Sequence, residues 1–194
     1  DPKNLKMVSV AAGARHSVAL SDKGEVYVWG DNSAGQLGVS GRSIQMVQRV
    51  ETLWKAFHGP KKVIAIAASE LSTLALAPRR SSPVNAVYEW GHGNHVPHKV
   101  HFDAVTNPII ISCARFHSVA IAESGKVFTW GLHADSLGGS RKQNNAASLT
   151  APQLVELPAN EKAVAASASE HHTAVVTDVG HLFTFGDSHN KNVL

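Results

Sequence analysis

Residues 8–30 read VSVAAGARHSVALSDKGEVYVWG, and two later stretches of the chain repeat this pattern. Residues 109–131 read IIISCARFHSVAIAESGKVFTWG, and residues 164–186 read VAASASEHHTAVVTDVGHLFTFG. In each stretch thirteen positions separate a histidine from an aromatic residue, in the pairs His16 and Trp29, His117 and Trp130, and His172 and Phe185. A spacing that is kept three times indicates an internal repeat.

A further copy, in residues 63–91, keeps the apolar segments but departs from the pattern at two points. Ser72 stands where the other copies have the histidine, and eighteen positions instead of thirteen separate it from Trp90. The sequence therefore predicts four divergent units, at approximately residues 6–60, 61–106, 107–161 and 162–194.

Three of the units carry the signature of a tight hairpin. An apolar segment ends in a four-residue turn whose last residue is glycine, at Gly24, Gly125 and Gly180. Glycine adopts the positive φ that this turn position requires without steric cost. In the strand that follows the first turn, Tyr27 and Trp29 share one face because successive side chains of a strand alternate. We expect these rings to fill the space between neighbouring sheets.

A last strand completes the pattern, and its residue types indicate an outer edge. Pro97 and Pro152 mark it in the second and third units, where the first unit has Val47. Proline fits an edge strand because it cannot donate a hydrogen bond to the ladder. The sequence therefore predicts an all-β fold, a partial β-propeller of about four blades, each a four-stranded antiparallel sheet.

The order of these positions resembles the repeat of the regulator of chromosome condensation family. The repeated positions are Gly13, His16, Gly24, Trp29, Gly30, Trp90, Gly91, His117, Gly125, Trp130, Gly131, His172, Gly180, Phe185 and Gly186. Ser72 and Phe185 depart from the pattern and indicate a divergent member. The resemblance implies a ring of about seven blades, of which these units would form roughly half, so we expect a fragment of a longer protein.

The third and fourth units also resemble the propeller of the inhibitor of Bruton tyrosine kinase group. That resemblance rests on residues 115–118, which read RFHS, and on residues 150–155, which read TAPQLV. Members of the group join ankyrin repeats, this propeller and BTB domains.

Composition excludes several classes of protein. The net charge is only +3, and the eighteen Lys and Arg residues are spread along the chain, so nucleic acid is not a favoured partner. Cys113 is the only cysteine, which excludes an internal disulfide. No apolar run approaches the roughly 18 residues of a membrane span, and the first residues lack the order of a secretory signal. We expect no membrane association and a cytoplasmic and/or nuclear location.

The repeated histidines stand next to Ser17, Ser118 and Thr173, an adjacency that resembles a nucleophile with its base. Catalysis needs one orienting acid and one oxyanion site, whereas here the pair recurs at several blade boundaries. We expect these histidines to be structural and to hydrogen-bond loop backbone between blades. Phosphate-loop, dinucleotide and nucleophile-elbow patterns are missing, so no catalytic residue and no cofactor are expected.

Four more histidines, His92, His95, His98 and His101, are spaced three residues apart. On a helix this spacing would line one face and could hold zinc. Glycine and proline among them argue against a helix, and the alternation of a strand would scatter the rings. We therefore expect a solvated loop and no metal site.

The candidate partner-binding residues break the repeat. Arg79 and Arg80 lie in the stretched second hairpin, Arg141 and Lys142 lie in a later loop, and Trp54 lies off the repeat spacing. Variable loops of propellers tend to carry function, and paired basic residues could contact an acidic partner. Solvated loops, and for Trp54 a linker packed on the blade, are the structural alternatives.

The predicted function is a non-catalytic protein–protein interaction module, a scaffold or adaptor, with protein partners that include a small GTPase or a ubiquitin-ligase component. The alternatives that the family resemblance implies are a guanine-nucleotide exchange factor for a small GTPase and a chromatin-binding propeller.

Overall fold

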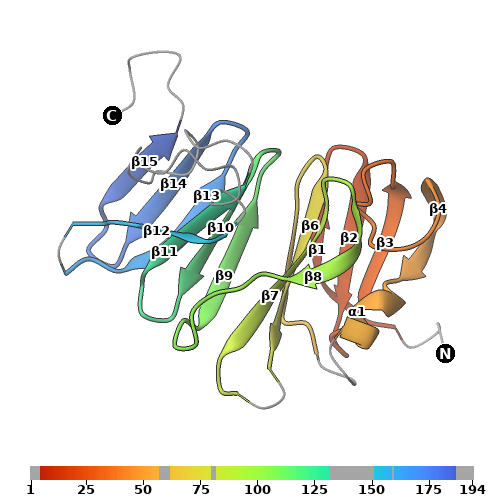
Figure 1. The fold of residues 1–194 in the computed structure, drawn as a ribbon, viewed down its shortest axis with the longest axis horizontal. Coiled ribbons are helices and arrows are strands. Elements are labelled where there is room, and N and C mark those ends of the chain that lie inside the picture. Colours follow the sequence, from red (N-terminus) through yellow and green to blue (C-terminus); the bar gives the residue numbers. More distant parts are fainter. Residues whose placement is uncertain (1–4, 57–61, 80–81, 132–150, 159, 187–194) are drawn as a thin grey trace. The chain divides into compact units, whose positions relative to one another are not determined.

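The computed structural model describes residues 5–56, 62–79, 82–131, 151–158 and 160–186 of the 194-residue chain. The chain divides into two compact units, Asp1–Lys99 and Val100–Leu194, and each of them holds two antiparallel sheets (Figure 1). The strands of every sheet follow one another in chain order, so each sheet is a meander.

The first unit contains two four-stranded sheets. The first sheet runs in the order β1 (Met7–Ala12), β2 (His16–Ser21), β3 (Val26–Asp31) and β4 (Ser43–Arg49). The second sheet runs in the order β5 (Ala65–Ala68), β6 (Ser72–Pro78), β7 (Asn85–Gly91) and β8 (Asn94–Lys99).

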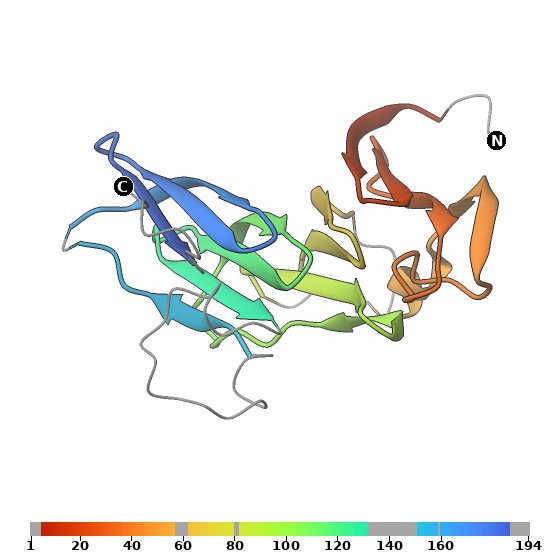
Figure 2. The same cartoon turned by 90° about the horizontal axis from the view of Figure 1, so that it is seen from above.

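The second unit contains a four-stranded and a three-stranded sheet. The third sheet consists of β9 (Pro108–Cys113), β10 (His117–Ala122), β11 (Val127–Gly131) and β12 (Gln153–Val155). The fourth sheet has three strands within the described ranges, which are β13 (Ala163–Ala168), β14 (His172–Thr177) and β15 (Leu182–Gly186). In Figure 2 the blue ribbon of the fourth sheet lies over the green and cyan ribbon of the third. The predicted all-β architecture of four antiparallel sheets is confirmed.

The hairpin turns have the predicted geometry. The φ angles of the turn glycines are 77° at Gly24, 82° at Gly125 and 86° at Gly180. Two of these turns also hold the linker to the next sheet, because the carbonyl of Gly24 accepts a hydrogen bond from the Val63 amide at 3.0 Å and that of Gly125 accepts one from the Ala163 amide at 2.9 Å. The turn glycine therefore both closes its own hairpin and positions the first strand of the next sheet.

One helix, α1 (Glu51–Ala56), was not expected from the sequence. It has six residues, carries the acidic Glu51 in its first turn, and packs on β8 of the same unit. A carboxylate near a helix N-terminus is favourable because it faces the positive end of the helix dipole. Across the described ranges, no helix is both long and apolar enough to span a bilayer.

The core of each unit lies between its two sheets. In the first unit Val18, Leu20, Val26 and Val28 of the first sheet join a buried cluster that includes Trp90 of the second. In the second unit a cluster joins the third and fourth sheets, and its buried members are Val119, Ile121, Val127, Val155, Ala163 and Val175. Burial of apolar surface between successive sheets is thus the main favourable term that holds each pair together.

Candidate functional site

The repeated histidine links one sheet to the next in the first unit. Nε2 of His16, on the first sheet, lies 2.9 Å from Oγ1 of Thr73, on the second. The Thr73 hydroxyl donates to the carbonyl oxygen of Gln36 at 2.7 Å. Because a threonine hydroxyl carries a single hydrogen, it must accept from His16, whose Nε2 therefore carries the proton.

The second unit repeats this link. Nε2 of His117, on the third sheet, lies 2.7 Å from Oγ1 of Thr173, on the fourth, and His16 and His117 are only 3% and 2% exposed. The sequence predicted that these histidines bond loop backbone, but their direct partners are threonine hydroxyls. In the first unit the Thr73 hydroxyl connects His16 to the backbone carbonyl of Gln36. Thr73 and Thr173 each follow the histidine position of their own repeat, so one repeat's histidine meets the next repeat's hydroxyl.

Burial changes the protonation of the His16 ring. Desolvation lowers the pKa of His16 to about 4, although the nearby Asp31 carboxylate raises it by a smaller amount. The ring is therefore neutral at physiological pH. Nδ1 of His16 is buried and has no hydrogen-bond partner among the described residues. A neutral ring enclosed between two sheets has no access to a substrate.

Two repeats use the same position differently. His172 is exposed, and its Nδ1 lies 2.9 Å from Oγ of Ser169 in the turn of its own sheet. In the second sheet, Ser72 replaces the histidine, and its Oγ lies 2.8 Å from Oγ of Ser69. The described residues hold no sheet after this one, so the expected bond of His172 to a following blade stays a prediction.

The repeated aromatic residues belong to the interior. Trp90 and Trp130 are 0% and 2% exposed, whereas Trp29 and Phe185 are partly buried. The indole of Trp90 lies so close to Gly38 that a Cβ there would be 2.9 Å from the ring. The glycine after each aromatic residue has positive φ, with values of 112° at Gly30, 106° at Gly91, 149° at Gly131 and 142° at Gly186.

At Gly13 the chain is tightly enclosed, because a Cβ would collide with the His16 ring and with the carbonyl oxygen of Ser69. These contacts place Gly13 beside the link between the first two sheets.

The structure does not bring the predicted partner-binding residues together. Arg79 follows β6 and is partly buried, whereas Arg80, Arg141 and Lys142 lie outside the described residues. Trp54 falls in α1, and its side chain is also outside the described part. Their role in binding stays a prediction.

The spaced histidines do not form a cluster. His95 and His98 are exposed on β8, and His92 occupies the preceding turn with a φ of 50°. Within the described ranges, no group of three or more His, Cys, Asp or Glu side chains is arranged to hold a metal ion.

A surface that the sequence interpretation missed lies at the tips of two turns in the second unit. The turn between β9 and β10 carries Arg115 and Phe116, and the turn between β13 and β14 carries Glu170 and His171. We call these four residues the docking cluster. The Arg115 guanidinium lies 4.9 Å from the centroid of the Phe116 ring and donates to the Glu170 carboxylate at 3.1 Å.

The remaining contacts of the docking cluster hold its rings in place. The Phe116 and His171 rings have centroids 5.9 Å apart, and Nε2 of His171 lies 3.8 Å from the Glu170 carboxylate. The side chains of Arg115, Glu170 and His171 are 41%, 48% and 48% exposed. Arginine and aromatic side chains that are positioned in advance are typical of protein-interface hot spots. The only sequence signal was that residues just before the repeated histidine vary between units.

The known proteins that this chain resembles agree with the repeat pattern. The profile of the regulator of chromosome condensation (RCC1) repeat matches residues 23–76 and 124–176, and a second profile of that description matches residues 7–36. Human E3 ubiquitin-protein ligase HERC2 is 27% identical to this chain, and the matched region covers 96% of this chain and 4% of HERC2. The mitochondrial RCC1 domain-containing protein RUG3 of Arabidopsis thaliana is also 27% identical, covering 97% of this chain and 44% of RUG3.

Solved structures give the same fold. Human WBSCR16 superposes with a TM-score of 0.77 at 23% identity, covering 94% of this chain and 48% of that one. Prp20p of Saccharomyces cerevisiae superposes with a TM-score of 0.77 at 21% identity, covering 93% of this chain and 44% of that one. The chain thus spans less than half the length of these relatives. Its four sheets are blades of a partial β-propeller, and the chain belongs to the regulator of chromosome condensation (RCC1) repeat family.

Proposed function

We propose that this chain is a non-catalytic protein-interaction module, a scaffold or adaptor, and that its docking cluster contacts the partner. The observation that carries the proposal is the Arg115–Phe116–Glu170–His171 arrangement, in which a cation, two rings and a carboxylate are held together at the surface. Side chains with catalytic potential, such as His16 and His117, are used instead between the sheets.

Relatives support a protein partner. Prp20p is described by its binding to Gsp1p and histones, and yeast RCC1 has been crystallised with Kap60. The names of HERC2 and HERC6 assign them to the E3 ubiquitin-protein ligases, so a ubiquitin-ligase component is one partner class that we propose. RUG3 is named as mitochondrial, whereas we propose a cytoplasmic and/or nuclear location for this protein.

The test compares two variants of the chain in affinity capture from cell extract, with bound proteins quantified by mass spectrometry. Phe116→Ala removes the ring at the centre of the docking cluster. Arg15→Ala is the matched control, because Arg15 is exposed and precedes the histidine of the first repeat as Phe116 does in the third. We expect proteins that wild type and Arg15→Ala retain and that Phe116→Ala loses. Equal retention by all three would show that the docking cluster is not the contact.

Guanine-nucleotide exchange is the second candidate, favoured by the fold shared with Prp20p, whose description names Gsp1p. Exchange needs only loops that displace the nucleotide of a partner, so the lack of a catalytic triad does not exclude it. A nucleotide-release assay against a panel of small GTPases separates the two functions. Release accelerated by this chain would overturn the pure scaffold proposal, and unchanged release across the panel would support it.

A further inference from the structure

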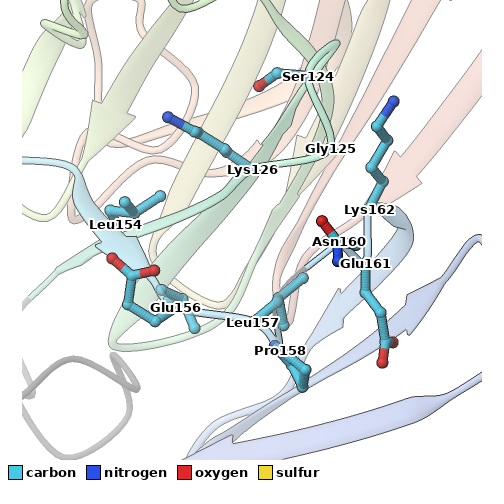
Figure 3. A pocket seen from close by; sticks show the side chains of 11 residues that line it. Ser124, Gly125, Lys126, Leu154, Glu156, Leu157, Pro158, Asn160, Glu161 and Lys162 are labelled. Atoms are coloured by element: carbon cyan, nitrogen blue, oxygen red, sulfur yellow. The ribbon is translucent and has the colours of Figure 1, made fainter.

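The second unit has a hollow of about 280 Å³ on the side of the hairpin turn that carries Gly125 (Figure 3). Its wall comes from that turn, from the end of β12 and from the linker to β13. The lining residues that decide its chemistry are Lys126, Leu154, Glu156, Leu157, Pro158 and Lys162. The docking cluster is carried by the turns at the opposite ends of the strands, because β10 runs from His117 beside the cluster to Ala122 beside this turn.

The two lysines give the hollow available positive charge. Lys126 and Lys162 are both exposed, and within the described part of the chain neither ammonium group forms an ion pair or a side-chain hydrogen bond. Figure 3 shows their side chains extending on either side of the turn that holds Ser124 and Gly125. Both groups are solvated, and the charge of Lys126 also acts on the Asp103 carboxylate, whose pKa it helps to lower.

Two acidic residues, Glu156 and Glu161, also line the hollow. Glu161 accepts hydrogen bonds from the Thr177 hydroxyl at 2.8 Å and from Nδ1 of His181 at 3.0 Å, and these contacts lower the pKa of its carboxyl. Its carboxylate points away from the lysines in Figure 3. Glu156 is exposed and lies next to Leu154, so it borders the hollow at a different point.

The remaining wall is apolar. Leu154 is 37% exposed on the edge strand β12, Pro158 is exposed, and Leu157 packs partly against the core of the unit. An exposed apolar surface marks an interaction site, and the cations beside it are complementary to a partner segment that carries carboxylates.

We propose that this hollow is a second interaction site, which binds an extended segment of a partner protein that carries carboxylate and apolar side chains two residues apart, on the same face of the segment. The carboxylates meet Lys126 and Lys162, and an apolar side chain covers Leu154 and Leu157. The proposal rests on the proposed function as an interaction module, but it uses a different surface from the docking cluster.

The test measures fluorescence anisotropy of a fluorescein-labelled peptide, Gly-Glu-Ser-Leu-Ser-Glu-Gly, with the whole chain. A peptide with glutamine for each glutamate and one with serine for the leucine are the matched ligands. We expect the first peptide to bind and the other two to bind at least about fivefold more weakly, since each surface ion pair contributes on the order of 1 kcal/mol or less. Raising the salt concentration should weaken the binding of the first peptide.

Charge reversal then locates the site. Lys126→Glu and Lys162→Glu should each weaken binding about fivefold or more, whereas Lys6→Glu, an exposed lysine of the first unit, is the control with the same change in net charge and should not. A melting curve for each variant excludes unfolding as the cause. Equal binding of the glutamine peptide, or equal binding by Lys126→Glu and Lys6→Glu, would overturn the proposal.

A further variant separates this proposal from the proposed function. Phe116→Ala should bind the peptide as wild type does, because Phe116 belongs to the docking cluster. If captured proteins depend on Phe116 but the peptide does not depend on Lys126 or Lys162, only the second site is wrong. If no protein depends on Phe116 while the peptide results hold, only the docking cluster is wrong.

Discussion

Burial of His16 couples the stability of the first unit to pH. Desolvation lowers the pKa of this ring from 6.5 to about 4, so the unfolded chain binds a proton that the folded chain does not bind over that interval. The contribution of the neutral ring to stability is therefore complete above pH 6.5. It is lost progressively as the pH falls from 6.5 towards 4, because protonation then favours the unfolded state.

We predict that His16→Gln reduces this loss, because glutamine keeps an amide donor for Thr73 but does not titrate. Urea unfolding at pH 7.5 and pH 4.5 measures the free energy of unfolding of both proteins. Between pH 7.5 and pH 4.5 the free energy of unfolding should fall less in the variant than in the wild-type protein. The difference should be up to about 3 kcal/mol, which corresponds to the pKa shift of His16. Equal falls in the two proteins would contradict the assignment of a neutral, buried His16.

The hydroxyl on the other side of this bond makes a separate prediction. Thr73→Val keeps the size of the side chain but leaves Nε2 of His16 and the carbonyl oxygen of Gln36 without this partner. We expect a loss of about 1–3 kcal/mol in the free energy of unfolding, the usual cost of unsatisfied buried polar groups. Thr73→Ser is the matched control, because it retains the hydroxyl, and it should lose less in the same urea titration at pH 7.5.

At the scale of the elements, two hairpin turns of the second unit offer a matched comparison. Gly125 and Gly180 have φ angles of 82° and 86°, so alanine is strained about equally by the backbone at both. At Gly180 a Cβ would meet nothing within 4 Å, whereas at Gly125 it would lie 2.7 Å from the Cα of Lys162 and collide with its side chain. The two turns therefore differ mainly because the linker to β13 packs against the turn at Gly125 and no such segment packs against the described turn at Gly180.

We predict that Gly180→Ala costs about 1–2 kcal/mol from backbone strain alone. Gly125→Ala should cost about 1–3 kcal/mol more, because the linker must move to admit the methyl group. Thermal unfolding followed by circular dichroism measures both. Equal destabilisation would mean that the linker does not enclose Gly125.

Because Lys162 lines the proposed peptide site, Gly125→Ala should also weaken peptide binding, whereas Gly180→Ala should not.

The strands and turns could be predicted because their causes are local. Alternation of apolar residues and a glycine with positive φ specify β2, β3 and the turn at Gly24 without reference to distant residues. Helix α1 was missed because six residues are too short to show a helical period. The docking cluster was missed because its ion pair joins Arg115 and Glu170, which are 55 residues apart in the sequence.

The contacts between blades could be predicted only in part. The repeat identified His16 and His117 as structural, but not the hydroxyl that each would meet, because the partner belongs to the next repeat. Nor did it predict that Ser72, in the second copy, would bond Ser69 within its own sheet. Repetition thus predicts the blade itself, whereas the contacts that differ between copies require the structure.

At the scale of the whole molecule, the fold is shared with relatives that differ in name and length, so the fold alone does not identify the function, and the proposal rests on particular surfaces. The docking cluster and the lysine-rimmed hollow both belong to the second unit and occupy opposite ends of its strands. A module with two such surfaces can hold two segments of one partner or two different partners, which is what a scaffold or adaptor requires.

Binding to DNA would separate the proposed scaffold from the chromatin-binding alternative. The chain carries only +3 at neutral pH with histidines uncharged, and its cations are spread along the sequence. Proteins that neutralise many phosphates bind DNA with steep salt dependence, and few phosphate contacts give weak, shallow binding. We predict that at pH 7.5 the whole chain leaves a DNA column at or below about 0.15 M salt, where screening has reduced the attraction between separated charges.

Strong retention of the chain at pH 7.5, to salt concentrations well above this value, would require a concentrated basic face. That outcome would favour the chromatin-binding alternative over the scaffold.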